Sequence, residues 1–220
     1  MKIDIISDSV CPWCYIGLKR IQQVRNEMPE LGLELRWRPF MLNPDMPPEG
    51  MSRKEYMRRK FGTSGTGSDN PAYKAIVEAG EQLGIPFAFG SIEKMPNTLD
   101  SHRLVRWAVT AGCHEEIVEI LFRKYFVDAL DISDPAVLID AAEEVGMDRE
   151  LVERLLAGND DKDLAIREDL DAREIGVTGV PAYLIEGKFI IPGAQDVKDM
   201  KLILTRVHKK FTAMQAEGTA

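Results

Sequence analysis

The sequence predicts an α/β domain that is interrupted by a long, all-helical insertion. Two observations support this prediction. Segments with the alternating pattern of β-strands occur only near the two ends of the 220-residue chain. The stretch between them has helical patterns and almost no strand signal. The strands at the two ends are therefore expected to share one sheet, so that residues 1–42 and 177–220 form one domain and residues 43–176 form the insertion.

The N-terminal end predicts a strand–helix–strand unit. Residues 2–10 alternate isoleucines with polar residues, as a half-buried strand does. Pro12 suits the first turn of a helix, where the missing N–H has no intrahelical partner. Helical spacing of apolar residues follows over 15–28, and Pro29 ends it. Residues 33–40 ("LELRWRPF") alternate again and predict the second strand.

The insertion is predicted to contain seven helices, separated by glycine, proline and helix-capping residues. A glycine- and serine-rich stretch over residues 62–71 is expected to be a flexible loop. The predicted helical segments are 51–62, 71–84, 97–112, 114–127, 133–146, 148–158 and 161–176.

Strand-like sequence returns after Gly179. Residues 182–185 ("AYLI") and 188–191 ("KFII") flank Glu186 and Gly187, and this arrangement predicts a β-hairpin. A last helix is expected from about residue 196 to residue 214.

Composition excludes several classes of function. The net charge of −8 argues against binding to nucleic acid, which requires a basic surface. No apolar run approaches the roughly 18 residues that span a membrane. The N-terminus lacks the apolar stretch of a signal peptide, and three cysteines make a poor disulfide framework. We therefore expect a cytoplasmic protein in a reducing compartment.

Cys11 and Cys14 form a C-x-x-C motif at the predicted junction of the first strand and helix. The thiolate is the reactive form of cysteine, and the N-terminus of a helix favours negative charge. Cys11 would lie at that N-terminus, with Cys14 on the same helical face and within reach of it. This spacing indicates an attacking thiol and a resolving thiol.

The cysteine pair has two other interpretations. A structural zinc site would need four ligands in a recognisable spacing. The chain has no second C-x-x-C motif and no H-x₃₋₅-H motif, so no metal is expected. A purely structural pair of core cysteines is the other alternative.

Val180 and Pro181 stand at the head of the third predicted strand, in "GVTGVPAYLI". A proline here donates no hydrogen bond to the sheet, and a cis bond would be a specific feature of the fold. An ordinary trans proline is the alternative. Its position favours the cis form.

These motifs together resemble the DsbA-like branch of the thioredoxin superfamily, and within it the FrnE-type group. The resemblance extends over nearly the whole chain, through "DSVCPWCYIG", "NTLDSHRL", "GVTGVPAYLI" and "IPGAQD". It implies a thioredoxin-like domain with a large all-helical insertion. The same architecture occurs in 2-hydroxychromene-2-carboxylate isomerases and kappa-class glutathione transferases.

The resemblance also implies roles for individual residues. It implies a cis Val180–Pro181 bond packed against the thiols, with the Val180 backbone pairing to a substrate peptide or to glutathione. Pro12 and Trp13, between the cysteines, are expected to belong to the same substrate-binding surface. Trp13 stands where periplasmic DsbA enzymes have a histidine, so a strongly oxidising pair is not expected.

The remaining residues implied by the resemblance have open alternatives. Gln195 and Asp196 correspond to positions that bind the glutamyl end of glutathione, and Asp196 is also a candidate N-cap of the last helix. Asn97 corresponds to a residue that faces the thiols, and it too is a candidate N-cap. His102 is either a proton carrier or a structural histidine, and Cys113 has no evident partner.

The expected function is that of a thiol–disulfide oxidoreductase of the reductase or isomerase type, because relatives with glutathione chemistry have serine at Cys11 and lack Cys14. A glutathione-dependent isomerase or transferase acting on a small aromatic compound is the alternative, and a non-enzymatic binding module is a third hypothesis. The expected partners are protein or peptide thiols and disulfides. Glutathione is a candidate co-substrate, and no tightly bound cofactor is expected. Monomer and homodimer are both left open.

Overall fold

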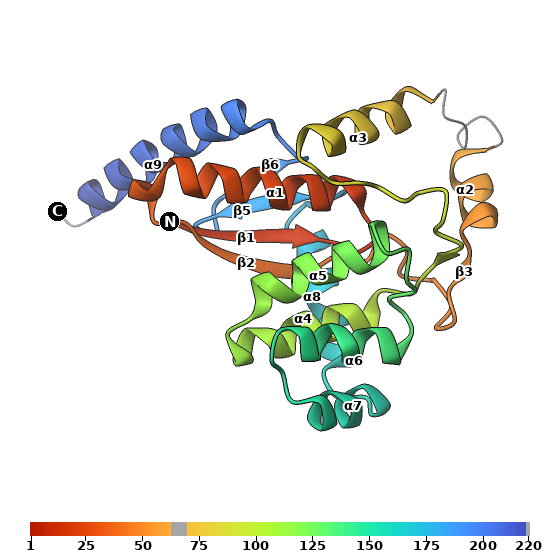
Figure 1. Cartoon of the computed structure of the whole chain (residues 1–220). Coiled ribbons are helices and arrows are strands. Elements are labelled where there is room, and N and C mark those ends of the chain that lie inside the picture. Colours follow the sequence, from red (N-terminus) through yellow and green to blue (C-terminus); the bar gives the residue numbers. More distant parts are fainter. Residues whose placement is uncertain (63–69, 219–220) are drawn as a thin grey trace.

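The computed structural model describes residues 1–62 and 70–218 and confirms an α/β fold with a helical insertion (Figure 1). Strands from both ends of the chain form one four-stranded sheet in the order β2-β1-β5-β6. Strand β1 (Lys2–Ser7) is parallel to β2 (Glu34–Pro39), and helix α1 (Pro12–Glu27) connects the two. Strand β5 (Ala182–Ile185) is antiparallel to both β1 and β6 (Phe189–Pro192).

The sheet has two apolar faces, because β1 and β5 each carry consecutive apolar residues. In β1, Ile3 and Ile5 belong to the core cluster that includes α1, whereas Ile6 belongs to a smaller cluster on the other face. In β5, Tyr183 lies in the first cluster and Ala182 in the second. Successive side chains of a strand point to opposite faces, so both strands are buried on both sides.

Helices cover both faces of the sheet. Helix α9 (Val197–Gly218) packs along α1 on one side, and α8 (Lys162–Glu174) packs against β2 on the other (Figure 1). The predicted hairpin is present: Glu186 and Gly187 both have positive φ angles, 50° and 66°, between β5 and β6.

All seven helices predicted for the insertion are present within the described residues. The helices that precede α8 are α2 (Arg53–Phe61), α3 (Pro71–Gln82), α4 (Leu99–Ala111), α5 (His114–Phe126), α6 (Pro135–Glu144) and α7 (Arg149–Ala157). The loop predicted over residues 62–71 falls mostly on residues 63–69, which lie outside the described residues. The division into domains at residues 42/43 and 176/177 stays a prediction.

The structure adds three short elements that the sequence did not predict. Strands β3 (Met51–Ser52) and β4 (Lys94–Met95) form a two-stranded antiparallel pair within the otherwise helical insertion. A 3₁₀ turn, η1 (Pro29–Leu31), follows α1. Two-residue strands are too short to show any alternation, so no periodic pattern could have indicated them.

Aromatic packing fixes the insertion against α1. Tyr15 of α1 stacks on Phe122 of α5, with ring centroids 5.1 Å apart and an interplanar angle of 11°. Phe126 and Phe87 extend the same aromatic group. This packing begins one residue after Cys14, so the insertion helps to hold the start of α1 in place. None of the described helices is long and apolar enough to cross a membrane.

Candidate active site

The loop between β1 and α1 places Cys11 at the N-cap of the helix. Cys11 has an extended backbone (φ −95°, ψ 112°), and Pro12 follows in the first turn. The Cys11 N–H donates to the Asp8 carbonyl at 3.0 Å, and the Cys11 carbonyl accepts from the N–H of Cys14 at 3.0 Å. The first turn of α1 is thus closed on Cys11, and its free N–H groups favour a negative charge there.

Both thiols are buried and lie against the loop that precedes β5. Cys11 is 5% exposed and Cys14 is 3% exposed, and in the described part of the chain both are free. The Cys11 thiol lies 3.5 Å from the Val180 carbonyl oxygen, to which it donates. The Val180–Pro181 peptide bond is cis. The structure therefore brings Cys11, Cys14, Val180 and Pro181 together from the two ends of the chain.

The two thiols differ in their environment. Burial raises the pKa of Cys14 well above its usual value, and the hydrogen bond and charge of Cys11 raise it further. The Ser7 hydroxyl and the Asp8 backbone N–H oppose this rise by stabilising the thiolate. Cys14 therefore holds its proton at neutral pH, which suits a thiol that acts second.

Gly17 allows the two halves of the site to approach each other. A Cβ atom at this position would lie 2.5 Å from the Tyr183 hydroxyl oxygen and 3.2 Å from Pro181 Cγ. Tyr183 is itself buried, and burial followed by the charge of Cys14 raises its pKa above the usual range. Sequence reasoning missed Gly17, although a glycine inside a helix is a known signal of close backbone approach.

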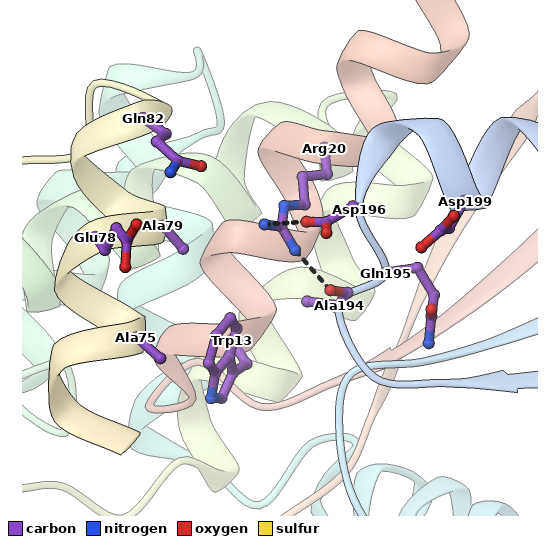
Figure 2. Close-up of a pocket in the computed structure, with 10 residues that line it drawn as sticks. All are labelled: Trp13, Arg20, Ala75, Glu78, Ala79, Gln82, Ala194, Gln195, Asp196 and Asp199. Atoms are coloured by element: carbon purple, nitrogen blue, oxygen red, sulfur yellow. Dashed lines mark hydrogen bonds and ion pairs between the residues drawn. The ribbon is translucent and has the colours of Figure 1, made fainter. Parts of the chain in front are cut away.

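A groove beside the thiols collects three more of the predicted binding residues. Figure 2 shows Trp13 between α3 and the loop that carries Ala194 and Gln195. Trp13, Gln195 and Asp196 line this groove, which has a volume of about 430 Å³. The groove brings together α1, α3 and the start of α9.

Arg20 holds one wall of the groove in place. Its guanidinium donates to the Ala194 carbonyl at 2.7 Å and pairs with the Asp196 carboxylate at 2.5 Å (Figure 2). The Gln195 side chain donates to the Pro192 carbonyl at 2.6 Å. Sequence reasoning also missed Arg20, whose partners lie more than 170 residues away.

The groove carries more negative than positive charge. Glu78, Asp196 and Asp199 contribute carboxylates, and Arg20, the groove's cation, is already paired with Asp196. Asp196 also begins α9, because its carbonyl accepts from the Met200 N–H at 2.8 Å. Its carboxylate is used in the ion pair with Arg20 and is 69% exposed.

Asn97 lies elsewhere, at the start of α4. Its amide donates to the Met46 carbonyl at 2.6 Å, and its side-chain oxygen accepts from the Leu99 N–H at 2.9 Å. It lines a separate pocket with Asp100, not the groove beside Trp13. These contacts are those of a residue that orders the first turn of a helix.

Two buried polar residues meet at the thiol loop, which is the connection of residues 8–11 between β1 and α1: Asp8 belongs to this loop, and His102 lies on α4. Asp8 is fully buried and His102 is 5% exposed, and the Asp8 carboxylate approaches the imidazole at 3.4 Å. The sequence offered no signal for Asp8. His102 stood out only because histidine titrates near neutral pH.

Cys113 is remote from the pair. It is half-buried at the N-cap of α5, and burial raises the pKa of its thiol. The next turn of α5 contacts the far end of α1 through an ion pair of Glu115 with Arg25 at 2.9 Å. At a rise of 1.5 Å per residue, Arg25 lies about 20 Å along α1 from Cys11, so Cys113 lies toward the end of α1 that is far from the thiol pair. Across the described ranges, no cluster of three or more His, Cys, Asp or Glu side chains is placed to hold a metal ion.

Comparisons with known proteins support one family. The family model of the DSBA-like thioredoxin domain matches residues 2–205. The uncharacterized protein YwbO of Bacillus subtilis (strain 168) is 26% identical over 199 residues, which cover 88% of this chain and 90% of YwbO. The solved structure of a probable DsbA oxidoreductase from Streptomyces coelicolor is 26% identical, with a TM-score of 0.82 and coverage of 94% and 89% of the two chains. The cytosolic disulfide reductase DsbM from Pseudomonas aeruginosa, solved with GSH, shares the fold at 15% identity, with a TM-score of 0.68 and coverage of 95% and 100%.

Proposed function

The chain belongs to the family of DsbA-like thioredoxin domains, and on that premise we propose that it is a thiol–disulfide oxidoreductase of the reductase or isomerase type. The observation that carries the proposal is the arrangement of Cys11 and Cys14. Two free thiols lie at the start of α1, one at the helix N-cap and the other one turn later. Their different environments suit two successive steps.

In the proposed reaction Cys11 attacks a disulfide of the substrate. One substrate sulfur becomes bonded to Cys11, and the other leaves as a thiolate that takes up a proton. Cys14 then attacks Cys11, which releases the second substrate sulfur and leaves a Cys11–Cys14 disulfide. The substrate gains two electrons, and the thiol pair loses them.

The direction of the reaction follows from what lies between the thiols. Trp13 supplies no positive charge that would stabilise the reduced pair, so a strongly oxidising potential is not expected. In a reducing compartment such a pair rests in the dithiol form. Reduction or isomerisation of substrate disulfides is then favoured over net oxidation.

We also propose where the substrate binds. The Val180 carbonyl faces Cys11 at 3.5 Å and offers a backbone acceptor beside the reacting sulfur. An extended peptide with its disulfide at Cys11 would pair with this backbone, as peptides do at exposed strand edges. The groove of Trp13, Gln195 and Asp196 would receive the part of the substrate that flanks the disulfide.

Glutathione is a second candidate substrate of the same site. The groove is large enough for a small peptide, and its outer wall is formed at the start of α9 by Gln195 and Asp196. A titration calorimetry experiment on the Cys14→Ser variant tests this role. Saturable heat with reduced glutathione would support it, and the absence of heat at millimolar concentrations would exclude it.

The main proposal is tested by the reduction of a fluorogenic, disulfide-bonded peptide. The Cys11→Ser variant should lose activity, and Cys14→Ser should accumulate a mixed disulfide that mass spectrometry locates at Cys11. Cys113→Ser is the matched control and should keep full activity, because this thiol lies at the far end of α1. Normal turnover by Cys11→Ser would refute the assignment.

A further inference from the structure

The proposed reaction sets a problem that the thiols do not solve by themselves. Cys14 must lose its proton before it can attack Cys11, because the thiolate is the nucleophile. Cys14 is 3% exposed, and its surroundings raise its pKa. Water in the bulk solvent has little access to this sulfur, so a buried proton acceptor would speed the step.

A buried pair with unused proton-binding capacity lies next to the thiol loop. Asp8 accepts the Leu42 N–H with Oδ2 at 2.8 Å, and its other oxygen, Oδ1, lies 3.4 Å from Nε2 of His102. Among the described residues neither Asp8 Oδ1 nor His102 Nε2 has a hydrogen-bond partner. A proton placed between these two atoms would satisfy both, and an unsatisfied buried pair is costly to maintain without a role.

A short polar route joins Cys14 to this pair. The Ser7 hydroxyl and the Asp8 backbone N–H both lower the pKa of Cys14, which places Ser7 and Asp8 next to its sulfur. Ser7 also lines a small cavity together with Ser9 and His102. The cavity has a volume of about 20 Å³, which is enough for one water molecule. Ser7 therefore touches both the resolving thiol and the space in front of His102.

Other contacts hold the two halves of the pair together. Ser9, in the thiol loop, bonds to the Ser101 hydroxyl at 3.0 Å, and Ser101 donates to the Thr98 carbonyl at 2.8 Å. The neighbouring residue on α4 is His102. The thiol loop and the start of α4 are thus fastened at the point where the aspartate meets the histidine.

We propose that the Asp8–His102 pair accepts the proton of Cys14 when Cys14 attacks the mixed disulfide, and that Ser7 and one water molecule in the cavity carry that proton. This inference rests on the proposed function. The proton moves to the space between Asp8 Oδ1 and His102 Nε2, and the Cys14 thiolate bonds to Cys11 Sγ. The bond between Cys11 and the substrate sulfur breaks, and the substrate leaves as a thiolate. The substrate disulfide is the oxidant, and the pair releases its proton to solvent afterwards.

The charged and titratable groups around the pair come from four elements. Arg38 on β2 lines the cavity, and the pKa of Tyr125 on α5 is raised by burial first and then by the charge of Asp8. Cys14 lies on α1. On α8, Asp169 accepts the N–H of Met41, the residue before Leu42, at 2.8 Å.

The test separates the two chemical steps. One equivalent of an aromatic disulfide, whose released thiolate absorbs visible light, is mixed with the reduced Cys113→Ser protein in a stopped-flow instrument. Attack by Cys11 releases the first thiolate, and resolution by Cys14 releases the second. Asp8→Asn and His102→Gln keep the shape of the pair but not its capacity for a proton, and Ser7→Ala interrupts the route.

The inference predicts that the second phase slows by about 10²-fold near pH 6 in Asp8→Asn and His102→Gln. The first phase should be unchanged, and the rates should converge with the parent protein at high pH, where hydroxide replaces the pair. Asp169→Asn is the matched control, because this buried carboxylate bonds to the adjacent Met41 N–H and to Arg173 rather than to His102. It should leave both phases intact.

Each contrary outcome has a distinct meaning. A second phase of unchanged rate and pH profile in His102→Gln overturns the inference, even when Asp8→Asn fails to fold. An equal slowing by Asp169→Asn, or a loss of both phases in His102→Gln, shows a structural role and also overturns it. If the parent protein lacks the second phase, the proposed function itself fails, and the inference fails with it.

Discussion

Replacing Gly17 by alanine should disturb the site at the contact between α1 and the loop before β5. The added Cβ would lie 2.5 Å from the Tyr183 hydroxyl oxygen and 3.2 Å from Pro181 Cγ. Overpacking of this kind costs about 1–3 kcal/mol, and the better helix propensity of alanine returns about 1 kcal/mol. Because an approach of 2.5 Å calls for the upper end of the overpacking cost, we expect a net loss of about 2 kcal/mol, or about 0.7 M in the urea midpoint for a slope of about 3 kcal/mol/M.

The same substitution should affect the chemistry. Relief of the clash moves Pro181 away from α1, and Val180 moves with it, so the 3.5 Å contact between its carbonyl and Cys11 is lost. The first phase of disulfide exchange should therefore slow, together with the loss in unfolding free energy.

A double variant tests the cause. Tyr183→Phe removes the hydroxyl that the new methyl group would meet, so Gly17→Ala should cost less in the Tyr183→Phe background, with a coupling energy of about 1 kcal/mol. Urea unfolding of the four proteins measures this coupling. If Gly17→Ala is as stable and as active as the parent protein, or if the two substitutions are additive, the reasoning about close approach is wrong.

Three further predictions concern the groove and the resolving thiol. Arg20→Met should lower the free energy of unfolding in urea by about 1–3 kcal/mol, because it leaves a loop carbonyl without its donor. Asp196→Asn should lower it by less than about 1 kcal/mol, since that carboxylate is 69% exposed. Equal losses in the two variants would contradict this prediction. The raised pKa of Cys14 means that the folded, reduced protein binds this proton more tightly than the unfolded chain, so stability should fall as the pH rises above about 9. Cys14→Ser should flatten that fall, and a parallel pH profile would argue against it. Removal of a negative charge from the groove, in Glu78→Gln or Asp199→Asn, should speed the reaction with oxidised glutathione by about two- to threefold at low salt. The same variants should react more slowly with cystamine, which is a cationic disulfide. An effect that does not depend on salt would exclude an electrostatic cause.

The parts of the fold that local patterns encode could be predicted from the sequence. The alternation over residues 2–10 and 33–40 predicted two strands, and β1 and β2 are both present and pair in parallel. Pro12 marked the first turn of α1, which placed Cys11 at its N-cap. Each of these features depends on residues within a few positions of one another, and so does the capping contact of Asn97 with Leu99.

The contacts that complete the candidate site were not predictable in this way. Cys11 meets Val180 across 169 residues, and Arg20 meets Ala194 across 174. No periodic pattern encodes such pairs, because they depend on how the two ends of the chain meet in the sheet. Asp8 and His102 likewise come from the thiol loop and from the insertion, and their pairing appears only when α4 is packed against that loop.

The central claim is that Cys11 and Cys14 form a reversible dithiol–disulfide pair. The most direct test is a redox titration in glutathione buffers, read by alkylation of the thiols and mass spectrometry, with Cys14→Ser as the control. The account predicts one reversible two-electron transition that is lost in Cys14→Ser, with a midpoint in the range of reductases and isomerases rather than of strong oxidants. The absence of a Cys11–Cys14 disulfide at any ratio, or a stable glutathione adduct on Cys11 in the parent protein, would contradict it.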